Sequence, residues 1–338
     1  MTLQERLSVL IKLGELLSAP DEYREAVIHR SYYHNQWLTK ENQRLALESI
    51  ANHMLQPDKL DQWLQRYDMH EPEAPLKVGL VLAGNIPLVG FHDVLCVFVA
   101  GHRSIIKLSD KDPYLLPFLL KRLGEIDPRT KAYFEIVERL DDFDAVIATG
   151  SNNSARYFEA YFGKYPHIIR RNRNAVAVLT GAESAEELHR LGDDVFRYFG
   201  LGCRNVAKLY LPKGYKFEAL LTALHEYREV VNHSKYKNNF DYNYALFMLN
   251  KVSYEANGCI LLTENSSLQS HIGGLHYEYY ESEEQLREEL AERQKEIQCV
   301  ISRKNFPDIP VFDFGQAQEP ELWDYADGVD TLQFLLDL

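Results

Sequence analysis

The chain has 338 residues, 46% of them hydrophobic, and carries a formal net charge of −13 at pH 7. This length allows one large or two medium domains with a substantial core, and the acidic balance argues against nucleic acid as the main partner, because phosphate binding needs clustered Lys and Arg. No apolar run approaches the roughly 20 residues that span a bilayer, and the N-terminus lacks the basic and apolar regions of a signal peptide. We therefore expect a cytoplasmic protein without a membrane span.

Residues 1–75 are predicted to form a helical segment. Between Leu3 and Leu17, leucine recurs at three- and four-residue steps, which makes one apolar helical face. Pro20 ends that pattern, and further helical patterns follow it. The polar, proline-marked stretch 71–75 is predicted to end the segment.

From residue 76 onward, short apolar runs alternate with helical patterns. This alternation is typical of a parallel sheet with helices on both faces, in which ligands bind at the carboxyl ends of the strands. The first three predicted strands end near Asn85, Lys107 and the pair Gly150-Ser151, so these residues are candidates for a binding site. The strands predicted in this part are at 78–82, 104–108, 145–148 and 175–179.

From about residue 182 the pattern indicates a second α/β unit. A helical pattern over 186–199 leads to a turn that contains Cys203, and the apolar run 206–211 is predicted to be a strand. The Asn- and Tyr-rich stretch 231–244 is predicted to be a loop. Further strands are predicted at 259–263, 276–280, 299–302 and 311–314, and a last helix at 331–338.

Cys203 is the cysteine with the most informative surroundings. The four cysteines are far apart and form no CxxC pair, so neither a zinc site nor a disulfide framework is predicted, and reduced thiols fit best. Cys203 follows Gly200 and Gly202 on a turn that can expose a thiol, and the adjacent Arg204 would favour the nucleophilic thiolate. A lone cysteine between apolar segments is more often a small core residue, so these residues alone leave both interpretations open.

Neither GxGxxG nor GxxxxGK[ST] occurs, so the common dinucleotide and P-loop signatures are absent. A different ordered set resembles the aldehyde dehydrogenase superfamily: the turn 83–88, the turn 107–113, Thr149-Gly150-Ser151 and the glycine-preceded Cys203. Within that superfamily the chain is most similar to the acyl-CoA reductases, the LuxC-like fatty acid reductase family. The stretches that carry this similarity are Gly84-Asn85-Ile86-Pro87, Asp93-Val94-Leu95, 170–174, Cys203-Arg204-Asn205-Val206 and 325–332.

The resemblance implies an aldehyde-dehydrogenase-like α/β fold with two doubly wound parallel-sheet subdomains and an N-terminal helical segment. It also implies an oxidoreductase acting on the aldehyde or oxo group, an NADPH-dependent reductase that converts a fatty acyl-CoA or another acyl thioester to the aldehyde through an acyl-cysteine. The implied divisions are a helical segment at 1–75, an NAD(P)-binding Rossmann-like domain at 76–181, a catalytic domain carrying Cys203 at 182–315 and a C-terminal segment at 316–338.

The resemblance assigns the covalent chemistry to Cys203, which would attack the acyl carbonyl. The side-chain amide of Asn85 and the backbone N–H of Cys203 would bind the oxyanion, although Asn85 considered alone also suits a turn. Hydrolytic aldehyde dehydrogenases carry a glutamate base where this chain reads 168–172, a stretch without a carboxylate, and a thioester reductase tolerates that loss. Arg170 and Arg171 could bind carrier phosphates, but we expect them to form ion pairs on the acidic protein surface.

The resemblance assigns cofactor binding to residues at the predicted strand ends. Lys107 would lie near the adenosine ribose, and Gly150 and Ser151 would lie near the pyrophosphate or the nicotinamide ribose. Ser109 and Lys111 favour a 2′-phosphate and hence NADPH, whereas Asp110 favours the free ribose hydroxyls of NADH. The resemblance implies NADPH, and NADH is the alternative. Considered singly, Lys107 also suits an exposed strand end and Ser151 a helix cap.

Two other functions remain open at this point. One is an acyl-phosphate reductase of the glutamyl phosphate type, and the other is a non-catalytic reductase-like subunit that binds acyl chains. The expected partners are an acyl-CoA or acyl-carrier thioester, acyl-transferase or synthetase subunits, and further copies of the chain. We expect no metal site, because no spacing of potential ligands suggests one.

Overall fold

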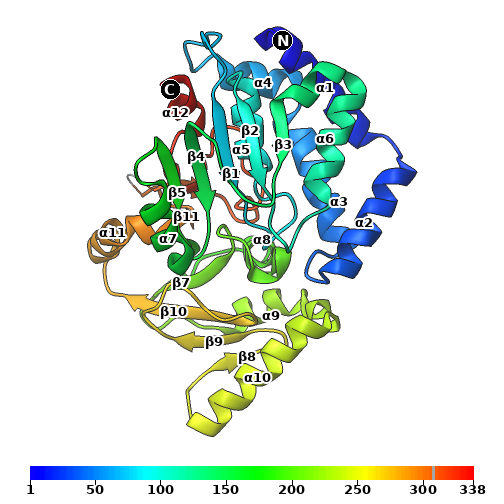
Figure 1. Cartoon of the computed structure of the whole chain (residues 1–338). Helices are drawn as coiled ribbons and strands as arrows, with labels where there is room; N and C mark the ends of the chain where they lie inside the picture. Colours follow the sequence, from blue (N-terminus) through cyan, green and yellow to red (C-terminus); the bar gives the residue numbers. More distant parts are fainter. Residues whose placement is uncertain (307–308) are drawn as a thin grey trace. The chain divides into compact units, whose positions relative to one another are not determined.

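The computed structural model describes residues 1–306 and 309–338, which form an α/β protein with two compact units (Figure 1). The first unit comprises residues 1–172 and 320–338, and the second comprises residues 173–319. Each unit contains a sheet of its own, and helices precede the first sheet in the chain. The predicted fold class, two α/β subdomains with an N-terminal helical segment, is confirmed.

The N-terminal helices pack an apolar face into the core of the first unit. They are α1 (Leu3–Ser18), α2 (Glu22–His34), α3 (Lys40–Ser49), the π-helical turn η1 (Ile50–Met54) and α4 (Pro57–Leu64). The start of α1 is fixed by a capping box, in which Thr2 and Glu5 each accept a hydrogen bond from the other's backbone N–H. Leu10 and Leu13 of this helix are buried in that core. The predicted helical segment is therefore present.

The first unit is built around a parallel sheet. Its strands are β1 (Lys77–Val81), β2 (Arg103–Lys107), β3 (Phe134–Ile136), β4 (Ala145–Thr149) and β5 (His167–Arg170), in the order β3-β2-β1-β4-β5. The strand order reverses between β1 and β4, and ligands of such sheets bind beside that reversal, at the carboxyl ends of the strands. The connections include α5 (Phe91–Val99), α6 (Leu115–Ile126), the 3₁₀ helix η2 (Pro128–Tyr133) and α7 (Asn152–Phe162).

The second unit contains a larger sheet. Its strands are β6 (Asn174–Val178), β7 (Val206–Pro212), β8 (Glu255–Ala256), β9 (Leu261–Glu264), β10 (Gly274–Tyr280), β11 (Ile297–Ile301) and β12 (Val311–Phe312), in the order β12-β11-β6-β7-β10-β9-β8. All neighbouring strands are parallel except β8 and β9. The helices of this unit are α8 (Ala185–Phe196), η3 (Arg197–Gly200), α9 (Glu218–His225), η4 (Arg228–Asn232), α10 (Ser234–Asn250), α11 (Glu283–Glu292) and η5 (Gln294–Glu296).

The C-terminal segment returns to the first unit, where it forms η6 (Ala326–Gly328) and α12 (Thr331–Leu336). Its aromatic and acidic side chains are hydrogen-bonded to α4 and to the residues just after it. The indole N–H of Trp63 donates to the hydroxyl of Tyr325 at 2.7 Å, and the hydroxyl of Tyr67 donates to the carboxylate of Asp330 at 2.8 Å. These buried or half-buried contacts explain why residues 320–338 form one compact unit with residues 1–172.

One predicted strand belongs to a different sheet from the one we expected. The apolar run at 175–179 is predicted to belong to the first α/β domain, but β6 pairs with β7 and β11 in the second sheet. A fully buried apolar strand fits the centre of any parallel sheet, so its residues do not specify which sheet it joins. The compact units accordingly divide after residue 172, ahead of this strand.

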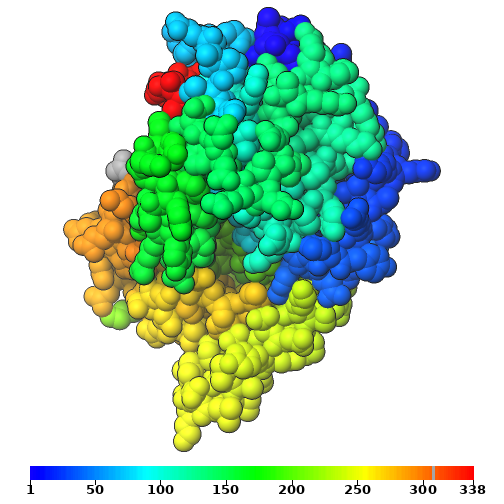
Figure 2. Space-filling view, in the orientation of Figure 1, coloured from blue at the N-terminus to red at the C-terminus, as the bar shows by residue number. Residues whose placement is uncertain are grey.

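The predicted loop at 231–244 is wrong, because most of it lies in α10. Tyr236 and Phe240, one helical turn apart, are buried on the same side of this helix, and His233 caps its first turn by accepting from the backbone N–H of Tyr236 at 3.3 Å. Asn and Tyr are weak helix formers, so tertiary packing decides here against local propensity. The rest of α10, drawn in yellow-green, is largely exposed (Figure 2).

None of the helices in the described part of the chain combines the length and the apolar character that a membrane crossing requires.

Candidate active site

The turn that carries Cys203 begins with unusual backbone geometry. Tyr198, Phe199 and Gly200 have φ angles of 55°, 60° and 75°, which places three successive residues in the left-handed region. Glycine adopts this conformation readily, but Tyr and Phe do so at a cost that the surrounding structure must offset. Phe199 is held by a ring contact with His233, at 4.3 Å between centroids. Such strain is concentrated at functional sites in proteins, and here it lies directly before the candidate nucleophile.

Asn205 fixes the other end of the same turn. Its buried side-chain oxygen accepts from the backbone N–H of Gly202 at 2.8 Å, and its amide nitrogen donates to the carbonyls of Asp194 at 3.0 Å and Arg197 at 2.7 Å. One side chain therefore joins the Cys203 turn to the end of α8. The sequence shows Asn205 beside Cys203 but not this role, which becomes visible only in the folded chain.

Cys203 differs from the other three cysteines in its exposure. Cys96, Cys259 and Cys299 are buried, whereas Cys203 is half-buried and lies on the turn. Burial raises the pKa of the Cys96 thiol well above its ordinary value and raises the pKa of Cys259 to about 12, so these two thiols stay protonated and unreactive. Because the other three cysteines are buried, Cys203 is the cysteine best placed to react with a ligand. The guanidinium of the adjacent Arg204 lies over the ring of Phe312, 5.2 Å from its centroid.

A buried carboxylate on α8 holds a second loop of this unit. Asp194 accepts from the backbone N–H of Gly315 at 2.7 Å and from that of Ala317 at 3.0 Å. Because Asn205 donates to the backbone carbonyl of Asp194, the Cys203 turn and the loop at 315–317 are anchored at the same residue. Burial raises the pKa of Asp194 to about 7, and the two N–H donors oppose that rise.

Replacing Asp194 by asparagine is expected to flatten the pH dependence of stability. The pKa of Asp194 rises from an ordinary 3.8 to about 7 on folding, so the native state binds its proton more tightly than the unfolded state does. The stabilisation from this proton is complete below pH 3.8 and is lost as the pH rises through about 7. Urea unfolding between pH 5 and 8 should show the wild type losing stability relative to Asp194→Asn. Asp193→Asn is the matched control, and parallel curves for wild type and Asp194→Asn would contradict the assignment.

In the first unit, the turns after β1 and β2 lie against each other. A Cβ atom on Gly84 would lie 2.6 Å from the hydroxyl oxygen of Ser109, so only glycine permits this approach. The backbone N–H of Leu88 donates to the buried carboxylate of Asp112 at 3.0 Å, and burial raises the pKa of Asp112 to about 6. These contacts place the turn of Asn85 beside Ser109 at the carboxyl edge of the first sheet. Lys107, the last residue of β2, is half-buried at the same edge.

Gly150 and Ser151 follow β4, across the point where the strand order reverses. A Cβ atom on Gly150 would lie 2.8 Å from the ring of Phe158, so this position also requires glycine. The hydroxyl of Ser151 accepts from the backbone N–H of Ser154 at 3.2 Å and caps α7. This is the helix-cap role that Ser151 considered singly also suggests. A capped helix N-terminus beside the reversal is a favourable place for an anionic group.

The predicted site residues therefore fall into two sets. Asn85, Lys107, Ser109 and Gly150-Ser151 share the carboxyl edge of the first sheet, and Cys203 lies in the second unit. Among the described residues, no group of three or more His, Cys, Asp or Glu side chains is arranged to hold a metal ion.

Arg170 and Arg171 both form ion pairs. Arg171 pairs with Glu159 at 2.5 Å on the surface, as expected. Arg170 pairs with Asp93 at 2.5 Å, but both side chains are only 6% exposed, so this pair is buried and not on the surface as we expected. Neither guanidinium needs a carrier phosphate to balance its charge.

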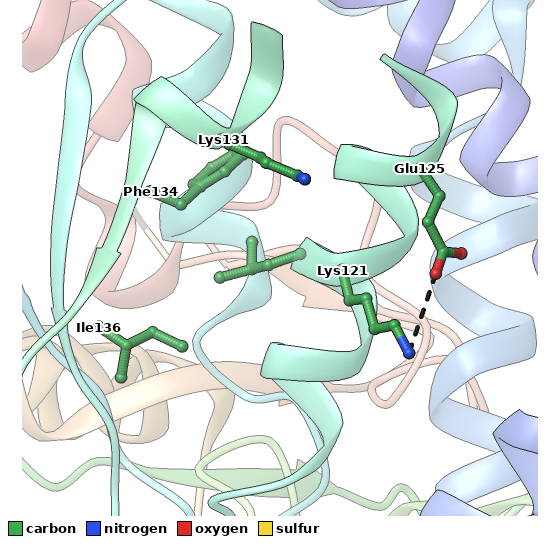
Figure 3. A pocket seen from close by; sticks show the side chains of 6 residues that line it. Lys121, Glu125, Lys131, Phe134 and Ile136 are labelled. Carbon is green, nitrogen blue, oxygen red and sulfur yellow. Dashed lines mark ion pairs between the residues drawn. The ribbon is translucent and has the colours of Figure 1, made fainter. Parts of the chain in front are cut away.

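A cavity of about 380 Å³ lies in the first unit but outside the candidate site (Figure 3). Its lining comes from α6, η2 and β3, and Lys121 pairs there with Glu125 at 3.9 Å. None of the predicted site residues lines it. The lining residues are Leu120, Lys121, Glu125, Lys131, Phe134 and Ile136.

Solved structures show which class of fold these two units form. Aldehyde dehydrogenase 21 from Physcomitrella patens, in complex with succinate, matches 100% of this chain and 84% of its own, with a TM-score of 0.72 and 12% identity. The NAD+ complex of an aldehyde dehydrogenase from Bacillus cereus matches 89% of this chain and 72% of its own, with a TM-score of 0.62 and 14% identity. The fold is therefore that of the aldehyde dehydrogenases.

The chain belongs to the family described as acyl-CoA reductase (LuxC), whose model matches residues 11–230. A "Long-chain acyl-protein thioester reductase" from Vibrio harveyi is 23% identical over 225 residues, which cover 60% of this chain and 46% of the relative. The chain thus matches less than half the length of that relative. The family resemblance inferred from the ordered turns is confirmed.

Proposed function

We propose that the protein reduces a long-chain acyl thioester to the aldehyde through an acyl-cysteine at Cys203. The observation that carries this proposal is the family match over residues 11–230, which spans Asn85, Lys107, Gly150-Ser151 and Cys203 together. A relative in that family is named for long-chain acyl-protein thioester reduction. The half-buried Cys203 on a strained, hydrogen-bonded turn supports the role of nucleophile.

The chemistry begins with attack of the Cys203 thiolate on the acyl carbonyl carbon. A new C–S bond forms, the bond to the carrier sulfur breaks, and the carrier thiolate leaves and takes up a proton. A bound nicotinamide cofactor supplies the hydride that reduces the acyl group. When the tetrahedral intermediate collapses, the Cys203 thiolate leaves again and the aldehyde is released. The Asn85 amide and the backbone N–H of Cys203 stabilise the oxyanion in both steps.

The absence of a base at the end of β5 favours reduction over hydrolysis. In this stretch the Arg170 side chain points into a buried ion pair with Asp93, and no carboxylate replaces the base of hydrolytic aldehyde dehydrogenases. Water attacking the acyl-cysteine would therefore lack a general base there. The same absence leaves the acyl group available for hydride.

We propose NADPH as the cofactor, bound at the carboxyl edge of the first sheet. The capped N-terminus of α7 can receive the pyrophosphate, Lys107 the adenosine ribose, and Ser109 a 2′-phosphate. Gly84 and Gly150 keep this edge free of side chains where backbone must approach closely. The exposed Asp110 would favour NADH instead, so both cofactors belong in the test.

The test incubates the protein with a long-chain acyl-CoA and either NADPH or NADH. We expect loss of reduced-cofactor absorbance, release of free thiol and an acyl adduct on the peptide containing Cys203 by mass spectrometry. The peptide containing Cys259 is the internal control and should carry no adduct. If no chain length gives either cofactor oxidation or an adduct, the proposal is overturned. Reduction of an acyl phosphate alone would favour the glutamyl phosphate type.

The family also leads us to propose a cytoplasmic homo-oligomer that receives its acyl group from an acyl-transferase or synthetase subunit. Size measurement in solution and co-purification with such a subunit would test these two points.

A further inference from the structure

Three stretches that distinguish this family in the sequence meet in one buried cluster of the first unit. The guanidinium of Arg170 donates through Nη1 to the carboxylate of Asp93 at 2.5 Å and through Nη2 to the hydroxyl of Thr331 at 2.8 Å. Asp93, Arg170 and Thr331 are 4%, 5% and 0% exposed. None of the three has a part in the proposed chemistry, so the cluster needs another explanation.

The cluster joins the elements that carry the candidate cofactor turns. Asp93 lies in the first turn of α5, the helix that follows the turn of Asn85. Arg170 ends β5, and its backbone carbonyl accepts from the N–H of Gly150 at 3.4 Å. Thr331 begins α12, which brings the C-terminal segment to the same place. A movement of the Arg170 side chain would therefore disturb contacts on both sides of the strand reversal, at α5 and at the Gly150 turn.

The position of Arg170 depends on few contacts. Its Nε atom is buried without a hydrogen bond among the described residues, so the bonds from Nη1 and Nη2 hold the planar group. Burial alone would lower the pKa of Arg170, but the adjacent Asp93 carboxylate raises it above its ordinary value. A guanidinium has a rigid fork of donors, which a lysine ammonium cannot reproduce. The arrangement is thus specific to arginine.

We propose that Arg170, Asp93 and Thr331 form a positioning centre that holds the Gly150-Ser151 turn in the geometry that binds the cofactor. This proposal rests on the proposed function for the identity of the bound molecule. It makes Arg170 a positioning residue that acts through the backbone of Gly150, and it assigns no carrier phosphate to this guanidinium.

The decisive variant replaces the ion pair by apolar side chains, as Asp93→Leu/Arg170→Met. Such replacements of a buried pair often leave stability unchanged, so this variant separates a positioning role from a merely structural one. We expect a thermal midpoint close to that of the wild type, but amide hydrogen exchange in the peptide around 149–155 at least about tenfold faster. Thr331→Val, the mildest change, should raise the Kd for NADPH about three- to tenfold. The alkylation rate of Cys203 should not change in either variant.

Arg171→Met is the matched control, since Arg171 is the next residue along the chain and its ion pair is exposed. The hydrogen-exchange measurement needs no cofactor, so it tests the positioning role independently of the proposed function. A wild type that binds neither NADPH nor NADH would overturn the proposed function but not the positioning role. Wild-type exchange around 149–155 in the double variant would overturn the positioning role. So would a Kd in the Thr331→Val variant equal to that of Arg171→Met, provided that the wild type binds NADPH.

Discussion

Cys203→Ala is expected to lower acyl-thioester-dependent oxidation of NADPH by at least ~10⁴-fold, because the variant has no nucleophile to take up the acyl group. The other thiols of the chain cannot replace it. Cys96, Cys259 and Cys299 are all buried, and burial raises the pKa values of Cys96 and Cys259, so neither of these two supplies a thiolate at neutral pH. The rate of cofactor oxidation and the acyl adduct on the Cys203 peptide should disappear together.

The loss of activity in Cys203→Ala should come from the missing thiol and not from a loss of stability. The side chain is small and half-buried, and the turn is held by Asn205 through Gly202, so we expect a change in the free energy of unfolding of less than about 1 kcal/mol. Thermal unfolding of the variant measures this. Cys259→Ala serves as the control that removes a thiol elsewhere in the same unit. Retained activity in Cys203→Ala would refute the acyl-cysteine mechanism even if the protein proved to be a reductase.

The elements that could be predicted are those whose pattern is strong and local. The buried runs of β1, β2 and β4 are bounded by turn residues, so their type and place were clear from the sequence. β3 and β5 were missed. β3 has three residues, two of them exposed, and β5 has an exposed first residue, so neither shows a continuous apolar run. Strands of this kind exist because a neighbouring strand supplies their hydrogen bonds, and that neighbour is remote in sequence.

In the candidate site, too, local features could be predicted from the sequence and long-range contacts could not. The order of the turns containing Asn85, Lys107 and Cys203 is a property of the sequence and led to the family, which the comparison confirmed. The roles of these single residues stay predictions. What the sequence could not show are the contacts made across long separations, such as Asp194 with Gly315 and Arg170 with Asp93. A buried Asp and an exposed Asp look alike in a sequence, because burial is set by the topology of the whole unit.

Asn85→Ala is expected to reduce kcat by about 10²- to 10³-fold, which corresponds to roughly 3 kcal/mol of transition-state stabilisation from one oxyanion donor. KM for the acyl thioester and for NADPH should change little, because the negative charge on oxygen develops only after the ground state. Single-turnover acylation of Cys203, followed by mass spectrometry, should slow by a similar factor. Asn238→Ala, an exposed asparagine in α10 with no proposed part in binding or catalysis, is the control and should retain full activity.

Asn85→Asp separates the oxyanion role from the structural explanation of the same residue. Asn and Asp both favour turns, so a residue needed only for the turn before Pro87 would tolerate this change. The carboxylate, however, has no N–H to donate and would repel the developing oxyanion, so Asn85→Asp should be at least as inactive as Asn85→Ala. Thermal unfolding should meanwhile show Asn85→Asp close to the wild type. If Asn85→Asp keeps its activity, the amide is a turn residue, and the oxyanion must be stabilised by the backbone N–H of Cys203 without it.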